Sequence, residues 1–116
     1  MSYQTKNCKM STPWGQSDYK IEYQRGLFRI NTPGHGGIAV SKGLAAKILS
    51  EKAIKLAGIV QGGYVFFEED CAVCVAALDS PLILESMAKS LNRPIDEMKR
   101  DMLSSVTRWF PQYLAA

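Results

Sequence analysis

Alternating apolar and polar residues predict a β-hairpin in the first third of the chain. In residues 19–23 apolar residues alternate with polar and charged ones, and the alternation resumes at residues 28–30 after a turn at residues 24–26. Because every second side chain of a strand points to the same face, this pattern indicates a hairpin with one buried face. The segment "TPGHGG" then interrupts the pattern, and the apolar run "IAV" at residues 38–40 predicts a third strand.

Helical spacing and a second apolar run dominate the rest of the chain. We expect Ser41 to cap a helix that breaks near Ser50, with a second short helical turn over residues 52–57. The continuous apolar run at residues 64–67 predicts a fourth strand that is buried on both faces. Helical segments follow after an acidic stretch, after Pro81 and after Pro94.

This order of elements predicts an α+β domain. We expect a small, mainly antiparallel sheet of three to four strands, a hairpin plus short strands, packed on one face against C-terminal helices. With 116 residues, 47% of them hydrophobic, the chain fits one domain over residues 12–116. Residues 1–11 are polar and without periodicity, which predicts a flexible N-terminal arm.

The composition predicts a cytoplasmic protein without a membrane segment or cofactor. The longest apolar runs are far shorter than the roughly 20 residues that cross a bilayer, and the N-terminus lacks the apolar stretch of a signal peptide. The three cysteines are an odd number, which favours free thiols in a reducing compartment.

The net charge of +3 is unevenly distributed along the sequence. Residues 1–57 hold nine Lys and Arg against three acids, which gives +6, and residues 58–116 hold five against eight, which gives −3. Such polarity is able to steer a nucleic acid or an acidic partner. A solvated surface with mixed charges is the simpler interpretation.

The only histidine, His35, is flanked by glycines in a turn. Three consecutive acids, Glu68, Glu69 and Asp70, end the predicted fourth strand, where their directions must diverge and at least one is expected to point inward. A carboxylate beside an imidazole either orients it for proton transfer or simply anchors the loop. We favour anchoring, and leave catalysis by His35 with these acids as the alternative.

Three glycines accompany this histidine: Gly34, Gly36 and Gly37. We expect them to supply backbone angles that other residues reach only at a cost.

Cys71 and Cys74 form a C-x-x-C pattern. A zinc site would need all four available ligands, Cys8, His35, Cys71 and Cys74, including one from the expected arm. A redox pair is disfavoured by the acids directly before Cys71, because negative charge opposes thiolate formation. We therefore expect two small residues packed in a buried helix and no metal.

Basic and aromatic residues supply candidates for binding. The candidates are Arg25, Arg29, Lys42, Lys47 and Trp14. They contain no recognised DNA- or RNA-binding signature, so a DNA-binding accessory role is a second alternative with diffuse support.

Three ordered segments carry a resemblance to a known family. The segments "TPWG", "TPGHGGIAVS" and "GGYVFFEEDCAV", within residues 12–78, resemble an uncharacterised domain family of phage and plasmid proteins. One departure from the family pattern is Val73, where a tryptophan is expected shortly after the first cysteine.

The resemblance implies an origin in a mobile genetic element. Short domains of that kind resemble accessory factors that block host defence, so we expect an anti-CRISPR or anti-restriction protein that occupies the surface of a host defence protein or ribonucleoprotein complex. The alternative is a small hydrolase or nuclease-like enzyme that uses His35 with Glu68, Glu69 or Asp70.

Overall fold

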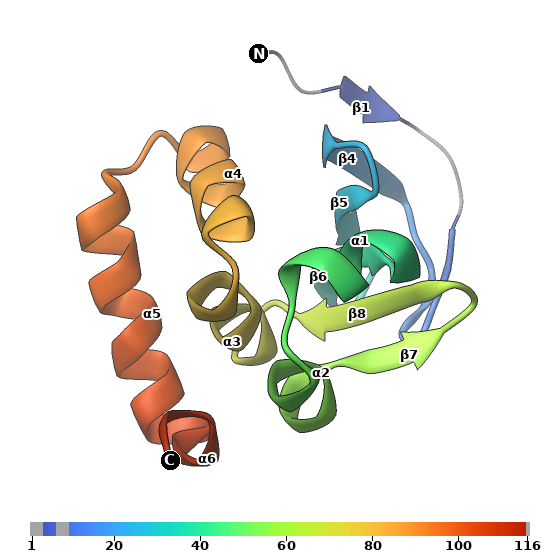
Figure 1. Ribbon diagram of the computed structural model, residues 1–116. Helices are drawn as coiled ribbons and strands as arrows, with labels where there is room; N and C mark the ends of the chain where they lie inside the picture. Colours follow the sequence, from blue (N-terminus) through green and yellow to red (C-terminus); the bar gives the residue numbers. More distant parts are fainter. Residues whose placement is uncertain (1–3, 7–9, 116) are drawn as a thin grey trace.

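The computed structural model describes residues 4–6 and 10–115, and its main feature is a six-stranded antiparallel sheet (Figure 1). The strand order is β1-β4-β5-β6-β8-β7, and a separate two-stranded ribbon is formed by β2 and β3. The bounds are β1 (Gln4–Lys6), β2 (Ser11–Thr12), β3 (Gly15–Gln16), β4 (Tyr19–Gln24), β5 (Leu27–Asn31), β6 (Gly36–Ser41), β7 (Ile59–Gln61) and β8 (Tyr64–Glu68).

Six helices accompany the sheet in the described part of the chain. Figure 1 shows α3, α4 and α5 together on one side of the sheet. None of the described helices has the length and apolar content that a bilayer span requires. Their bounds are α1 (Lys42–Ile48), α2 (Glu51–Ala57), α3 (Ala72–Asp79), α4 (Pro81–Leu91), α5 (Ile95–Trp109) and α6 (Pro111–Leu114).

The predicted α+β class is confirmed, and the sheet has more strands than the three to four expected. Residues 59–61, for which no strand was predicted, form β7 at the edge of the sheet. All three are exposed, so no alternation marks them as a strand. The turn that returns the chain to β8 depends on Gly62 and Gly63, whose φ angles of +56° and +84° suit a two-residue hairpin loop.

The expected N-terminal arm is described only in part. Residues 1–3 and 7–9 lie outside the described residues, and residues 4–6 form β1, which pairs with β4. Because the pairing runs through backbone groups, the polar side chains of this segment gave no signal for it.

The two faces of the sheet have different coverings. Leu27, Val40 and Phe67 belong to the core that the helices cover. Phe28, Ile30 and Phe66 face the other way, toward Met10 and Trp14 at the β2–β3 ribbon. The run at residues 64–67 therefore contributes to both faces, as its continuous apolar pattern predicted.

Serine caps define the break between α1 and α2. The Ser41 hydroxyl accepts a hydrogen bond from the backbone of Leu44, and the Ser50 hydroxyl accepts one from Ala53. The predicted cap and the predicted break near Ser50 are thus confirmed. Asp79 at the end of α3 accepts hydrogen bonds from both the backbone and the hydroxyl of Ser50, which fixes the start of α2.

Candidate functional site

Two Thr-Pro turns build the candidate site, and the first presents Trp14. The Thr12 hydroxyl donates to the Gly15 carbonyl at 2.6 Å and accepts from the Trp14 backbone at 3.0 Å. Gly15 has a φ of +107°, which closes the turn between β2 and β3. Because Thr12 is buried while the turn reaches the surface, its hydroxyl holds the backbone that carries the indole.

The second turn repeats this chemistry between β5 and β6 and presents His35. The Thr32 hydroxyl donates to the His35 carbonyl at 2.8 Å and accepts from the His35 backbone at 3.2 Å. The Thr32 backbone also donates to the same carbonyl at 2.8 Å. The loop is therefore closed largely by a buried threonine, which the sequence interpretation did not single out.

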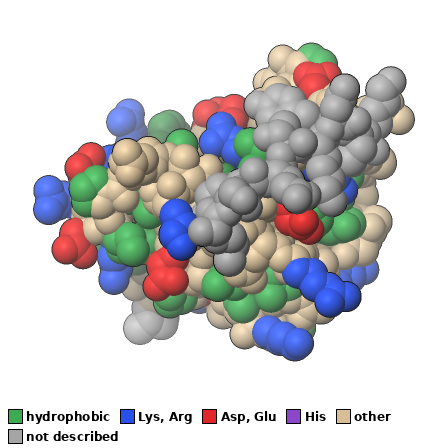
Figure 2. Space-filling model, turned by 90° about the horizontal axis from the view of Figure 1, so that it is seen from above, with side chains coloured by type: hydrophobic (Ala, Val, Ile, Leu, Met, Phe, Trp, Pro, Cys, Tyr) green, Lys and Arg blue, Asp and Glu red, His purple; other side chains and the backbone are tan. Residues whose placement is uncertain are grey.

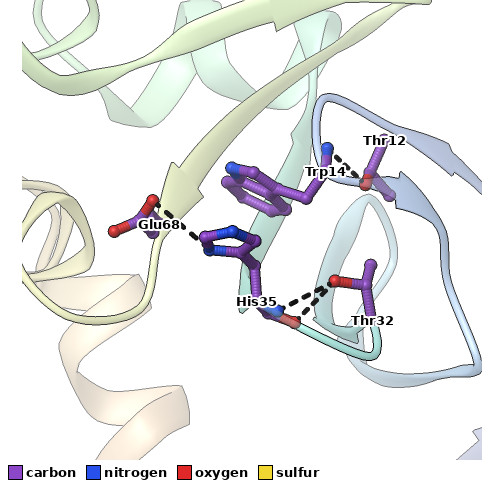
Figure 3. A network of polar contacts seen from close by, with 5 residues as sticks. All are labelled: Thr12, Trp14, Thr32, His35 and Glu68. Atoms are coloured by element: carbon purple, nitrogen blue, oxygen red, sulfur yellow. Dashed lines mark hydrogen bonds and ion pairs between the residues drawn. The ribbon is translucent and has the colours of Figure 1, made fainter.

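The two turns bring their rings together beside a carboxylate (Figure 3). The Trp14 and His35 rings stack with centroids 6.5 Å apart and an interplanar angle of 28°. The His35 Nδ1 lies 3.8 Å from the Glu68 Oε2, and the two side chains are 54% and 40% exposed. The predicted proximity of His35 to the acidic segment is thus observed at Glu68, and we call these residues the Trp14–His35–Glu68 cluster.

The cluster lies on the face of the sheet away from the helices. The Trp14 ring contacts Phe66 edge-on, with centroids 5.9 Å apart. Phe66 belongs to the core on that face, so one side of the indole is supported by packed side chains. His35 itself is exposed. The arrangement is a supported aromatic surface with a carboxylate at its border.

The three glycines around His35 do not act as expected. Gly34, Gly36 and Gly37 all lack a positive φ, so the backbone-angle explanation is wrong. At Gly37 a side chain is excluded by steric overlap instead, because a Cβ there would lie 2.1 Å from the Phe67 carbonyl oxygen and 3.0 Å from the Trp14 ring. A Cβ at Gly36 would lie 2.6 Å from the Glu69 carboxylate, whereas a Cβ at Gly34 would meet nothing within 4 Å.

The three acids diverge as predicted, but none is buried. Glu68 is partly exposed beside His35, and Glu69 and Asp70 are exposed. The expectation that one points inward is therefore wrong, because the strand ends at this point and its last residues reach solvent. Glu69 and Asp70 line a cavity on the helix side, together with Arg29.

The basic candidates do not gather around Trp14. Arg25 lies in the β4–β5 turn, and Lys42 is the first residue of α1. The two residues are close to each other because the backbone N–H of the neighbouring Ser41 donates a hydrogen bond to the Gly26 carbonyl. Four residues of β6 separate that end from Gly37, or roughly 13 Å of extended strand. Lys47 lies in the last turn of α1. On the face shown in Figure 2, basic side chains occupy several edges and acidic ones are interspersed among them.

A family comparison covers nearly the whole chain. Residues 7–116 match the model of a domain of unknown function, DUF7007. The chain belongs to the DUF7007 family. No curated protein and no solved structure matches it significantly. The match confirms that the chain belongs to an uncharacterised domain family, and it includes the C-terminal helices as well as residues 12–78.

The cysteines of this DUF7007 domain do not form the candidate zinc site within the described residues. Cys8 lies outside them, and the described His, Cys, Asp and Glu side chains contain no group of three able to hold a metal. Cys71 and Cys74 are free thiols. Burial raises the pKa of the Cys74 thiol, and the half-buried Cys74 packs against two apolar clusters, as expected. The same expectation is wrong for Cys71, which precedes α3 as its N-cap residue and packs in neither cluster, because the helix begins only at Ala72.

Proposed function

We propose that this DUF7007 protein is a binding protein that occupies a surface of its partner, with the Trp14–His35–Glu68 cluster as the contact surface. The stacked pair of the half-buried Trp14 ring and the exposed His35 ring, held on hydrogen-bonded turns, supports this proposal. Aromatic residues with a polar border carry much of the energy in protein interfaces. Rings already held in place lose little conformational entropy when they bind, which favours affinity.

The partner class that we propose is a host defence complex, either a protein or a ribonucleoprotein. The resemblance to phage and plasmid proteins supports a mobile-element origin and an anti-CRISPR or anti-restriction role. The cluster draws its three residues from the three segments that carry this resemblance: Trp14 from "TPWG", His35 from "TPGHGG" and Glu68 from "FFEEDC".

The geometry gives less support to a hydrolase or nuclease-like enzyme. A general base acts within about 2.6–3.2 Å of its partner, and the enclosing walls of an active site exclude water. The His35–Glu68 distance is 3.8 Å with both side chains well exposed. Three cavities of about 560, 270 and 390 Å³ among the described residues are lined by neither His35 nor Glu68.

The test is affinity purification of the tagged protein from bacterial cells that carry defence systems. We expect a defence complex to copurify with the wild type and with Lys99→Ala, whose exposed side chain lies on α5. His35→Ala and Trp14→Ala, each checked for folding by circular dichroism, should lose most of it. Equal recovery by both folded variants would contradict the proposal.

A second measurement separates the binding and enzyme hypotheses. The purified protein and its folded His35→Ala variant are assayed for nuclease and esterase turnover. We expect no turnover that depends on His35. Turnover that disappears in His35→Ala while the defence complex still copurifies would favour the enzyme.

A further inference from the structure

A cavity of about 270 Å³ lies on the helix side of the sheet, across the sheet from the Trp14–His35–Glu68 cluster. It opens between strands β4–β6 and helices α3 and α4. The side chains that give it its chemistry are Arg29, Glu69, Asp70, Val73, Met87 and Leu91. This volume approaches the lower end of small-ligand sites, which begin at about 300 Å³.

Arg29 is the unusual member of this lining. It pairs in register with Ile38 on β6, in the layer of the sheet that packs against the helices. The side chain is half-buried and forms no hydrogen bond or ion pair with any described residue. A half-buried guanidinium without a protein partner has N–H donors available to a ligand that enters the cavity.

The other residues that line the cavity restrict the charge and polarity of a ligand that fits there. Val73 and Met87 are buried and apolar, and Leu91 at the end of α4 is 45% exposed although it is apolar. Glu69 and Asp70 supply negative charge near the cavity. A polyanion such as nucleic acid would be repelled by these two carboxylates, whereas a single negative charge is repelled less and pairs with Arg29.

We propose that this cavity binds a carboxylate attached to a short apolar group, with Arg29 as the anchor of the carboxylate and Leu91 as the apolar contact. The planar guanidinium matches a carboxylate through two parallel hydrogen bonds. The ligand is a free small acid or the C-terminal residue of a protein, since both carry the same chemistry. The inference does not depend on the proposed function, because the exposed cluster lies on the other face of the sheet.

The probe is N-acetyl-L-leucine, titrated into ¹⁵N-labelled protein and followed by NMR. We expect saturable shifts at Gly37, Val73 and Leu91 with a Kd of about 1 mM, equivalent to about −4 kcal/mol. The uncharged N-acetyl-L-leucine amide should bind at least about tenfold more weakly, because it lacks the carboxylate that pairs with Arg29. Inorganic phosphate should also bind at least about tenfold more weakly, because it lacks the apolar group and its higher charge is repelled by Glu69 and Asp70. Equal binding of the amide or of phosphate would overturn the proposal.

Variants locate the site. Arg29→Met removes the charge at similar volume, and we expect it to weaken N-acetyl-L-leucine binding about tenfold or more. Leu91→Gln, at an exposed position where folding is secure, should weaken binding several-fold through lost apolar contact. Arg100→Met at an exposed position of α5 is the matched control and should bind as the wild type does. Unchanged binding in both Arg29→Met and Leu91→Gln would refute the assignment.

A second arm distinguishes the two sources of the carboxylate. An octapeptide that ends in the same leucine carboxylate is compared with N-acetyl-L-leucine. Binding about tenfold tighter would assign the cavity to a protein C-terminus, because flanking residues then add contacts. Equal or weaker binding would assign it to a free acid.

Discussion

Gly37 allows the parts of the candidate site to pack closely together. Its position on β6 lies against the backbone of β8 on one side and the Trp14 ring on the other. The strand and the indole approach each other only because no side chain stands between them. The absence of a side chain at Gly37 therefore allows the sheet and the first Thr-Pro turn to pack together.

We expect Gly37→Ala to lower the free energy of unfolding by at least about 2 kcal/mol, because the added carbon must displace backbone. That carbon would stand 2.1 Å from the Phe67 carbonyl oxygen. Gly34→Ala is the matched control, since nothing lies within 4 Å of its Cβ. The control should leave stability unchanged or raise it by up to about 1 kcal/mol. Urea unfolding measures both, and similar values would contradict the steric explanation.

The Thr32 hydroxyl stabilises the second turn, between β5 and β6, by hydrogen bonds with the backbone carbonyl and N–H of His35. We expect Thr32→Val, which keeps the shape but loses these hydrogen bonds, to cost about 1–2 kcal/mol in the free energy of unfolding. Thr107→Val on α5 is the control, because its hydroxyl only bonds the exposed Leu103 carbonyl of the same helix. It should cost less than about 0.5 kcal/mol. A Thr32→Val variant as stable as this control would show that the turn closes without the hydroxyl.

At the scale of elements, Asp79 connects three helices. It is the last residue of α3, it caps α2 through Ser50, and its Oδ1 accepts a hydrogen bond from the Tyr113 hydroxyl of α6 at 2.8 Å. Burial, followed by the hydrogen bond and the charge of Asp79, raises the pKa of Tyr113 to about 12. The ionised phenolate is therefore disfavoured in the folded protein.

This shift makes stability depend on pH in the alkaline range. Below pH 10 the phenol is protonated in both states, so its contribution is complete. Between pH 10 and about 12 the unfolded chain releases the proton first, and stability falls as pH rises. We expect the difference in stability between wild type and Tyr113→Phe to shrink from pH 9 to pH 11 in urea unfolding. A difference that stays constant over this range would contradict the link.

The sequence predicts those elements that have a side-chain pattern, but it does not predict those that are defined by backbone hydrogen bonds alone. Side-chain periodicity located the β4–β5 hairpin, and the serine caps fixed the break at Ser50. The exposed strand β7 escaped detection because its backbone pairing leaves no side-chain pattern. Charge and turn residues placed His35 near Glu68 correctly, but the role of Thr12 and Thr32 depends on hydroxyl contacts with the backbone, which spacing alone does not reveal.

For the whole molecule, folding redistributes the charge that the sequence divides into halves. The helical layer at residues 72–115 holds five basic and five acidic residues and is neutral. The net −3 of residues 58–116 therefore comes from Glu68, Glu69 and Asp70, and these lie at the same end of the sheet as Trp14 and His35. A nucleic acid that approached the Trp14 and His35 rings would be repelled by the Glu68 carboxylate beside them.

This distribution sets an expectation for the DNA-binding hypothesis. Three candidate cations, Arg25, Lys42 and Lys47, lie away from the acidic end, and a duplex held by these three alone would have about three phosphates neutralised. The logarithm of the duplex affinity should then fall with the logarithm of salt concentration with a slope no steeper than about −2.7. Fluorescence anisotropy with a 20-base-pair duplex, at about 50 to 200 mM KCl, measures that slope. A slope near −6 that becomes shallower when these three residues are replaced by alanine would instead support a DNA-binding role. Such a slope requires a basic surface that neutralises about six or seven phosphates together.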